Sequence, residues 1–274
     1  MRSGWILPLF FAANLWAADK LAIVEAFFEE PDGRITRNLT LTAGDTNYFS
    51  FKVAGFRADA RQHVSLVYSL QCLDSRGVPV VESFNDKVDI TLAPQDEHWQ
   101  PKVSWSVVVP VYAPSGDYLM RVRVEDQNAK AEARYEASFK VRGETTPPEE
   151  KLALRRFTFA DSESGPVKPD NVFRPGSTLW ARFKLVGFRI TPEKEYWVEY
   201  DLAVVDSTGR VLFSNPNAAV EKHKQFYPPQ VLSTDFNLDL KGGVKPGEYT
   251  IRLDVHDRLG EQNLSYEEKF RVEP

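Results

Sequence analysis

The heptapeptide FKVAGFR, residues 51–57, returns as FKLVGFR at residues 183–189, 132 positions further along the chain. The same spacing separates further pairs: Gly44/Gly176, Tyr68/Tyr200, Asp74/Asp206 and Gly77/Gly209. A spacing of 131 separates later pairs: Gly116/Gly247, Tyr118/Tyr249, Asp126/Asp257, Tyr135/Tyr266 and Phe139/Phe270. A repeat of this length is a whole domain rather than a solenoid unit, so we interpret the chain as a tandem duplication.

The residues around these repeats alternate between apolar and polar side chains. In YLMRVRVED, residues 118–126, every second residue from Tyr118 to Val124 is apolar, and the arginines fall on the opposite face. This period of two is typical of strands with one buried face. Between the strand patterns, DSxG sequences at 74–77 and 206–209 predict tight turns. We therefore predict an all-β chain of two immunoglobulin-like antiparallel β-sandwiches, each with about seven strands.

The chain divides at the segment GETTPPEEK, residues 143–151, which holds two prolines, three glutamates and no apolar residue. Such a composition predicts a short, stiff, solvated linker. The expected boundaries are a signal peptide over 1–18, a first sandwich over 19–143, a linker over 144–151 and a second sandwich over 152–274.

The first residues, MRSGWILPLFFAANLWAADK, carry one arginine, then an apolar run, then small residues at Ala17 and Ala18. This pattern is typical of a secretory signal peptide, and an uncleaved signal anchor is the alternative. We expect an exported protein, periplasmic or extracellular, with no membrane span once the signal is removed.

The single cysteine, Cys72, excludes an internal disulfide, and its counterpart in the second half is Val204. We interpret Cys72 as a small core residue. The net charge is −5, from 34 basic and 39 acidic side chains. This mild, mixed charge argues against a nucleic-acid partner, which usually meets a concentrated basic surface.

No sequence motif indicates catalysis, a metal site or a cofactor. The four histidines (His63, His98, His223 and His256) show no metal-binding spacing, and there is no GxSxG motif. Asp126 and Asp257 could serve a calcium site, but each follows a strand where a turn is expected, and we favour the turn. We predict no enzyme activity, with a scattered hydrolase site as the alternative.

Four aromatic residues are the candidate contact surface: Phe84, Trp99, Phe226 and Tyr227. They fall in or beside polar stretches that differ between the two halves, and exposed loop aromatics often form binding sites. The alternative is that these loops fold back and bury their rings over the sandwich edge.

The stretches GDYLMRVRVED and PGEYTIRLDVHD each lead to a terminal strand with the pattern F-x-V, residues 139–141 and 270–272. They resemble the last two strands of immunoglobulin-like and fibronectin-III-like modules of exported bacterial proteins. The resemblance implies a spacer, an adhesion unit or a partner-binding domain. We expect an envelope or secreted protein as partner, with a polysaccharide ligand or a ligand-free spacer as alternatives.

Overall fold

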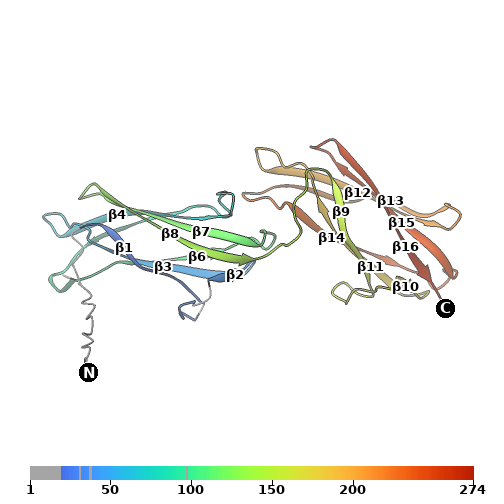
Figure 1. Cartoon of the computed structure of the whole chain (residues 1–274), viewed down its shortest axis with the longest axis horizontal. Helices are drawn as coiled ribbons and strands as arrows, with labels where there is room; N and C mark the ends of the chain where they lie inside the picture. The colour runs from blue at the N-terminus through green and yellow to red at the C-terminus, as the bar shows by residue number, and fades with distance from the viewer. Residues whose placement is uncertain (1–19, 31, 37–38, 97) are drawn as a thin grey trace, which may run out of the picture.

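The computed structural model describes residues 20–30, 32–36, 39–96 and 98–274. The predicted signal peptide, residues 1–18, lies outside them. These residues form two β-sandwiches arranged end to end, which we call domain 1 (strands β1–β8) and domain 2 (strands β9–β16) (Figure 1). The all-β sandwich class predicted from the alternating pattern is confirmed.

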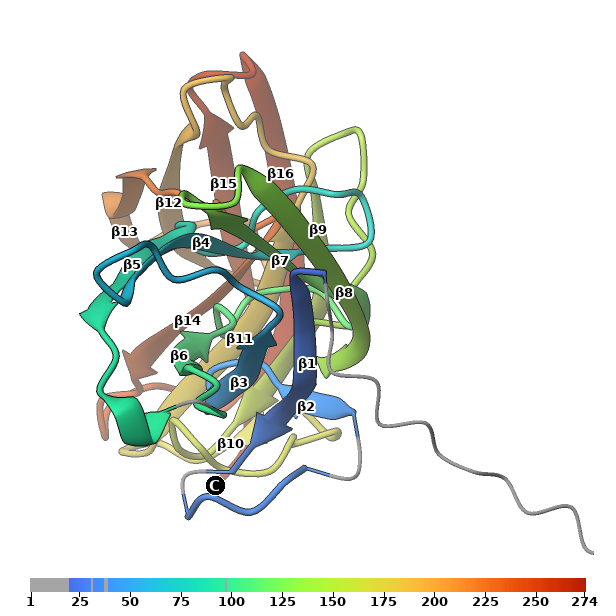
Figure 2. The ribbon, with the colours of Figure 1, turned by 90° about the vertical axis from the view of Figure 1, so that its left-hand side faces the viewer.

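Domain 1 packs a three-stranded sheet against a five-stranded sheet, and Figure 2 shows these two layers from the domain 1 end of the molecule. The first sheet has the order β1 (Ala22–Glu29), β3 (Thr46–Ala54), β6 (Lys102–Val108). The second has the order β2 (Thr40–Thr42), β8 (Ala131–Arg142), β7 (Gly116–Asp126), β4 (His63–Leu73), β5 (Phe84–Thr91). A short 3-10 helix, η1 (Pro94–Asp96), follows β5.

Domain 2 has the same two sheets in the same order. The three-stranded sheet is β9 (Ala153–Ala160), β11 (Thr178–Val186), β14 (Val231–Asp239). The five-stranded sheet is β10 (Val172–Phe173), β16 (Gln262–Val272), β15 (Gly247–Asp257), β12 (Glu195–Asp206), β13 (Val211–Lys224). The sheets are not purely antiparallel as predicted, because β2 pairs parallel with β8 and β10 pairs parallel with β16. In each domain this short strand covers the edge of the last strand, which would otherwise remain open.

Aromatic side chains from both sheets fill the two cores. Phe28 packs between Phe49 and Phe139 in domain 1, and Phe159 packs against Phe270 in domain 2. Each such buried side chain contributes roughly 1.5–3 kcal/mol to folding. At the start of β7, the Tyr118 hydroxyl donates to the Pro114 carbonyl at 2.7 Å. Tyr249 makes the same bond to the Lys245 carbonyl at 2.6 Å; this tyrosine corner is typical of immunoglobulin-like sandwiches.

The repeated heptapeptide makes one chain turn in both domains. Its glycine, Gly55 or Gly187, has a positive φ of 71° or 76° and ends the strand. Two residues later, the Arg57 N–H donates to Asp126 Oδ2 at 2.7 Å. The Arg189 N–H likewise donates to Asp257 Oδ2 at 2.8 Å. These aspartates are buried and also accept hydrogen bonds from amides of the following turn, which supports the turn role over a calcium role.

Cys72 lies fully buried in the core of domain 1. Burial, together with the nearby Asp74 carboxylate, raises the pKa of its thiol to about 12. Since the thiolate is the reactive form of cysteine, the side chain is unreactive while domain 1 is folded.

Candidate functional site

Two of the four predicted contact residues lie in domain 1, and neither stands free on a loop. Phe84 is the first residue of β5 and stacks on Trp105, with ring centroids 6.0 Å apart. Trp99 follows η1 and is half-buried, with its ring edge-on to Phe56 at 6.0 Å. Phe84 packs back against the sandwich, as the alternative interpretation has it, whereas Trp99 does so in part and keeps some of its surface exposed.

The other two, Phe226 and Tyr227, lie on the loop between β13 and β14 at the domain 1 end of domain 2. Phe226 is 40% exposed, and the Lys194 ammonium lies 4.0 Å from its ring centroid. Tyr227 is only 4% exposed, so it cannot serve an outside partner as predicted. Its ring belongs instead to the hydrophobic core of domain 1. The predicted four-residue surface is therefore not assembled.

Tyr227 is the centre of the contact between the domains. Its ring stacks on Tyr112 with a centroid distance of 6.5 Å and an interplanar angle of 10°. Its hydroxyl donates to Asp74 Oδ2 at 3.1 Å, in the turn after β4. Beside it, the Tyr112 hydroxyl donates to Gln225 Oε1 at 2.7 Å. The loop is therefore structural, and it locks domain 2 onto the end of domain 1.

The linker adds a second contact between the domains. Glu144 forms an ion pair with Lys184 of β11, and Thr146 is buried, so the segment is less solvated than its composition predicts. Burial alone would raise the pKa of the Glu144 carboxyl. Hydrogen bonds from Lys184 and Thr146, with the lysine charge, outweigh burial and lower this pKa to about 2.

We expect acid to loosen this linker contact. Because the pKa of Glu144 is lower in the folded protein than its ordinary value of 4.5, the contact is at full strength above that value. Its contribution is lost as pH falls toward about 2. Small-angle X-ray scattering should show greater freedom between the domains over this interval. Glu144→Gln should be looser at neutral pH and respond less to acid, and equal acid responses would contradict the assignment.

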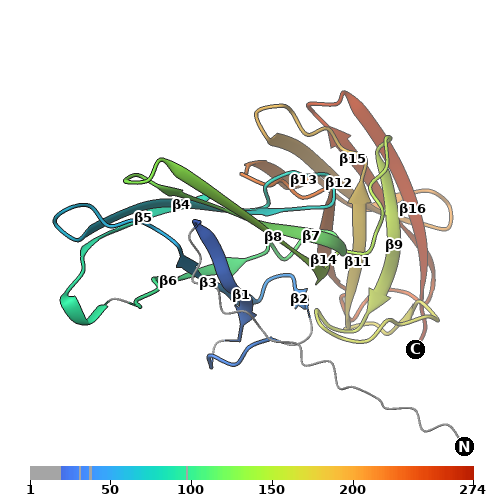
Figure 3. The ribbon, with the colours of Figure 1, turned by 60° about the vertical axis from the view of Figure 1, so that its left-hand side comes forward.

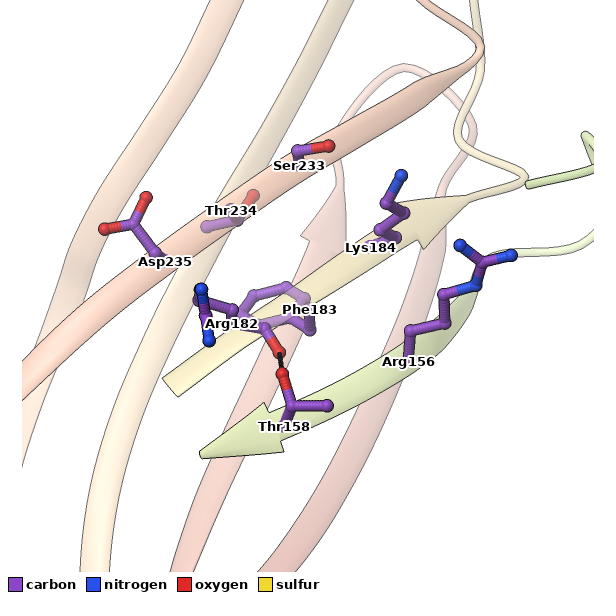
Figure 4. Close-up of a pocket in the computed structure, with 8 residues that line it drawn as sticks. All are labelled: Arg156, Thr158, Arg182, Phe183, Lys184, Ser233, Thr234 and Asp235. Atoms are coloured by element: carbon purple, nitrogen blue, oxygen red, sulfur yellow. Dashed lines mark hydrogen bonds between the residues drawn. The ribbon is translucent and has the colours of Figure 1, made fainter. Parts of the chain in front are cut away.

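The outer face of the three-stranded sheet of domain 2 carries an open pocket of about 350 Å³ (Figure 4). Its charged lining residues are Arg156 on β9, Arg182 and Lys184 on β11, and Asp235 on β14. Arg156 and Lys184 extend on the same side of the sheet, and Thr158 contributes a hydroxyl. We call these five residues the cationic face.

Local backbone structure aims these side chains outward. The pairing of β9 with β11 shifts register between Arg182 and Lys184, and Arg156 takes a positive φ of 54° at this β-bulge. An extra residue in one strand re-aims its side chain, so Arg156 projects from the sheet. The loop after β9 fixes Arg182, because its guanidinium donates to the Gly165 carbonyl at 2.8 Å.

Domain 1 lacks this charge pattern at the matching places. Its bulge holds Glu25, which pairs with Lys52 at 2.6 Å. Ser50 lies opposite Ser104 where domain 2 pairs Arg182 with Asp235. In domain 2 the bulge residue is instead Arg156, which makes no hydrogen bond or ion pair with another described residue. The cationic face is therefore particular to domain 2.

The side chains of this face have the chemistry that could bind an anion. Arginine presents a planar fork of donors that matches a carboxylate. Arg156 can offer such a fork, with Arg182 beside it, whereas Lys184 is already paired with Glu144. Within the described ranges no group of three His, Cys, Asp or Glu side chains is placed to hold a metal ion. No helix among the described residues is long and apolar enough to cross a membrane.

Sequence reasoning did not find the cationic face, although a signal was present. At a spacing of 132, Arg182 matches Ser50. Arg156 matches Val24 at that spacing, and only a spacing of 131 sets it against Glu25, the bulge residue of domain 1. Arginines on a polar strand face resemble ordinary solvated residues, so this difference between the halves does not by itself indicate a site. Only the strand register shows that they share one pocket with Lys184.

The fold and the site define the class as an all-β protein of two β-sandwich domains, with a group of cationic side chains on one sheet face of domain 2. No protein-family model matches the sequence, and no curated protein matches it.

Among solved structures, three similarities are weak. The Pseudomonas fluorescens alkylpurine DNA glycosylase AlkC bound to DNA containing an abasic site analog is 14% identical, with a TM-score of 0.30, and the match covers 45% of this chain and 31% of that chain. The Streptococcus agalactiae AgI/II polypeptide BspA C-terminal domain is 12% identical, with a TM-score of 0.30, and the match covers 93% and 100%. Native Escherichia coli alpha-2-macroglobulin is 10% identical, with a TM-score of 0.28, and the match covers 92% and 17%. TM-scores this low carry no argument about function.

Proposed function

We propose that this protein is an exported, non-enzymatic interaction module, and that its cationic face binds an acidic segment of a partner protein. The observation that carries the proposal is the exposed Arg156, which pairs with no other described residue and lies beside Arg182 and Lys184 in one pocket. Domain 1 has a neutralised pair at the matching place. Export is inferred from the signal-peptide pattern of residues 1–18.

A protein segment fits this face better than a uniform polyanion. Asp235 lies directly across from Arg182, and Lys184 is already paired with Glu144. A densely charged nucleic acid or sulfated polysaccharide would meet these carboxylates and be repelled by them. A segment with spaced acidic side chains can form ion pairs with Arg156 and Arg182 and place no carboxylate next to Asp235. The net charge of −5 agrees with a local rather than a general attraction to anions.

The test is isothermal titration with a short peptide of alternating Glu and Ser. We expect weak binding, and Arg156→Gln or Arg182→Gln should each reduce affinity about tenfold, the effect of losing one charge-assisted hydrogen bond. Lys52→Gln on the matching face of domain 1 is the control and should leave binding unchanged. A peptide of Gln and Ser should not bind.

Three results would count against the proposal. An oligogalacturonate that binds tighter than the peptide, with the same dependence on Arg156, would favour a carbohydrate ligand. An equal loss with Lys52→Gln would mean diffuse charge attraction rather than a site. No binding of either probe would favour a spacer without a ligand.

A further inference from the structure

A second surface lies at the free end of domain 2, remote from domain 1. An apolar groove of about 250 Å³ opens there between the edge strands β13 and β14. Leu212 and Phe213 line it and are 47% and 41% exposed, and Leu238 and Val244 lie across from them. Its floor includes Tyr249 and Phe270. At this volume the groove suits one large side chain better than a drug-sized ligand, whose sites begin at about 300 Å³.

The matching place in domain 1 is covered. Leu212 corresponds to Val80 at a spacing of 132, and Val80 is only 1% exposed. Val244 corresponds to Ala113 at a spacing of 131, and Ala113 is fully buried. The covering group at this end of domain 1 is Tyr227, which reaches in from the β13–β14 loop of domain 2. The domain contact is therefore an aromatic loop of one sandwich closing the open end of another.

The contact has two parts, an open end of one sandwich and an aromatic loop of the next. A similar open end and a similar loop occur once more, at opposite ends of the molecule. The open groove is on domain 2. The loop of domain 1 that matches the Tyr227 loop joins β5 to β6, and it carries η1 and the half-buried Trp99. It lies at the end of domain 1 remote from domain 2 (Figure 3). If two copies lie end to end, the groove of one copy faces this loop of the next, as the open end of domain 1 faces the Tyr227 loop within one chain.

We propose that the protein self-associates head to tail, with Trp99 of one copy entering the domain 2 groove of the next. The occupant is inferred from continuity with the domain contact, in which Tyr227 donates to Asp74. Asp206 is the counterpart of Asp74 at a spacing of 132, and it pairs across the sheet with the groove residue Tyr249. The Trp99 indole N–H can therefore donate to its carboxylate. Such a heterologous contact does not close on itself, so it forms open chains.

The test is analytical ultracentrifugation of the protein and two single variants. Because one loop forms the contact, association should be weak, with dissociation constants of roughly 10 µM or above. The average mass should rise with concentration. Phe213→Asp removes the groove and Trp99→Ala removes the loop, so each variant alone should stay monomeric. Val220→Asp, on the same edge strand at 53% exposure, is the matched control and should associate normally.

Mixing the two variants is decisive. Trp99→Ala keeps an intact groove and Phe213→Asp keeps an intact loop, so an equimolar mixture should form one-to-one dimers and nothing larger. A protein that stays monomeric at all concentrations overturns the proposal. So does association that survives Trp99→Ala, which would indicate a symmetric groove contact, or a mixture that forms no dimer. Leu212→Lys and Trp99→Leu repeat the test if either first variant melts early by circular dichroism.

Discussion

Replacing Gly187 with alanine should unfold domain 2 under conditions where the unaltered protein is fully native. Gly187 has a φ of +76°, where alanine is strained, and an added Cβ would lie 1.9 Å from the Lys151 carbonyl oxygen. The obstructing atoms are backbone, so a side-chain rotation cannot relieve the clash. We expect domain 2 to lose more than about 3 kcal/mol of stability, because strain and displacement of β9 add together.

Urea unfolding followed by tryptophan fluorescence measures this loss, and Gly209→Ala is the matched control. Gly209 has a φ of +83°, but an added Cβ there meets nothing within 4 Å. The control therefore carries backbone strain alone, with a cost of about 1 kcal/mol. If both variants lose the same stability, the clash with Lys151 has no energetic effect and the argument fails.

Cys72 reports on domain 1 in the same experiment. Its thiol is buried and protonated, so alkylation requires domain 1 to open. In Gly187→Ala the thiol should remain largely protected while domain 2 is unfolded. Its protection should nevertheless fall below that of the unaltered protein, since an unfolded domain 2 withdraws Tyr227 from the core of domain 1.

The parts of this structure that depend on local pattern could be predicted from sequence. Alternation from Tyr118 to Val124 is enough to show that β7 has one buried face, and the four apolar residues of this alternation are all buried in the structure. The DSxG turn follows from Asp74, whose carboxylate accepts the Arg76 and Val78 amides at 2.9 Å each. Both features are decided within a few residues of chain.

The parts that depend on pairing between distant segments could not be predicted from the sequence. Arg156 reaches the cationic face because a bulge shifts β9 against β11, and bulges leave no reliable local signature. Tyr227 and Trp99 looked alike as aromatic residues on polar loops. One is buried because another domain stands opposite its loop, and no feature of the sequence near it specifies that neighbour.

Tyr227→Ala should lower the stability of domain 1, although the substituted residue belongs to domain 2. The variant removes a ring from the domain 1 core, its stacking on Tyr112 and its hydrogen bond to Asp74. Truncating a buried aromatic residue costs about 3–5 kcal/mol. Burial, with the nearby Asp74 carboxylate, raises the pKa of Tyr227 to about 12, so the hydroxyl is protonated and donates at all ordinary pH values.

The two contributions can be separated by substitution. Tyr227→Phe keeps the ring and removes the hydroxyl, so it should cost about 1 kcal/mol, moderated because Arg76 still pairs with Asp74 at 2.8 Å. Phe226→Ala, next to it but 40% exposed, is the control and should change domain 1 little. The readouts are the alkylation rate of Cys72 and, by NMR relaxation, the tumbling of each domain. Of these variants, only Tyr227→Ala should show both faster alkylation and independent tumbling of the two domains. Unchanged alkylation would mean that the Tyr227 contact contributes nothing to the stability of domain 1. In that case the domain contact would no longer support the proposed head-to-tail association.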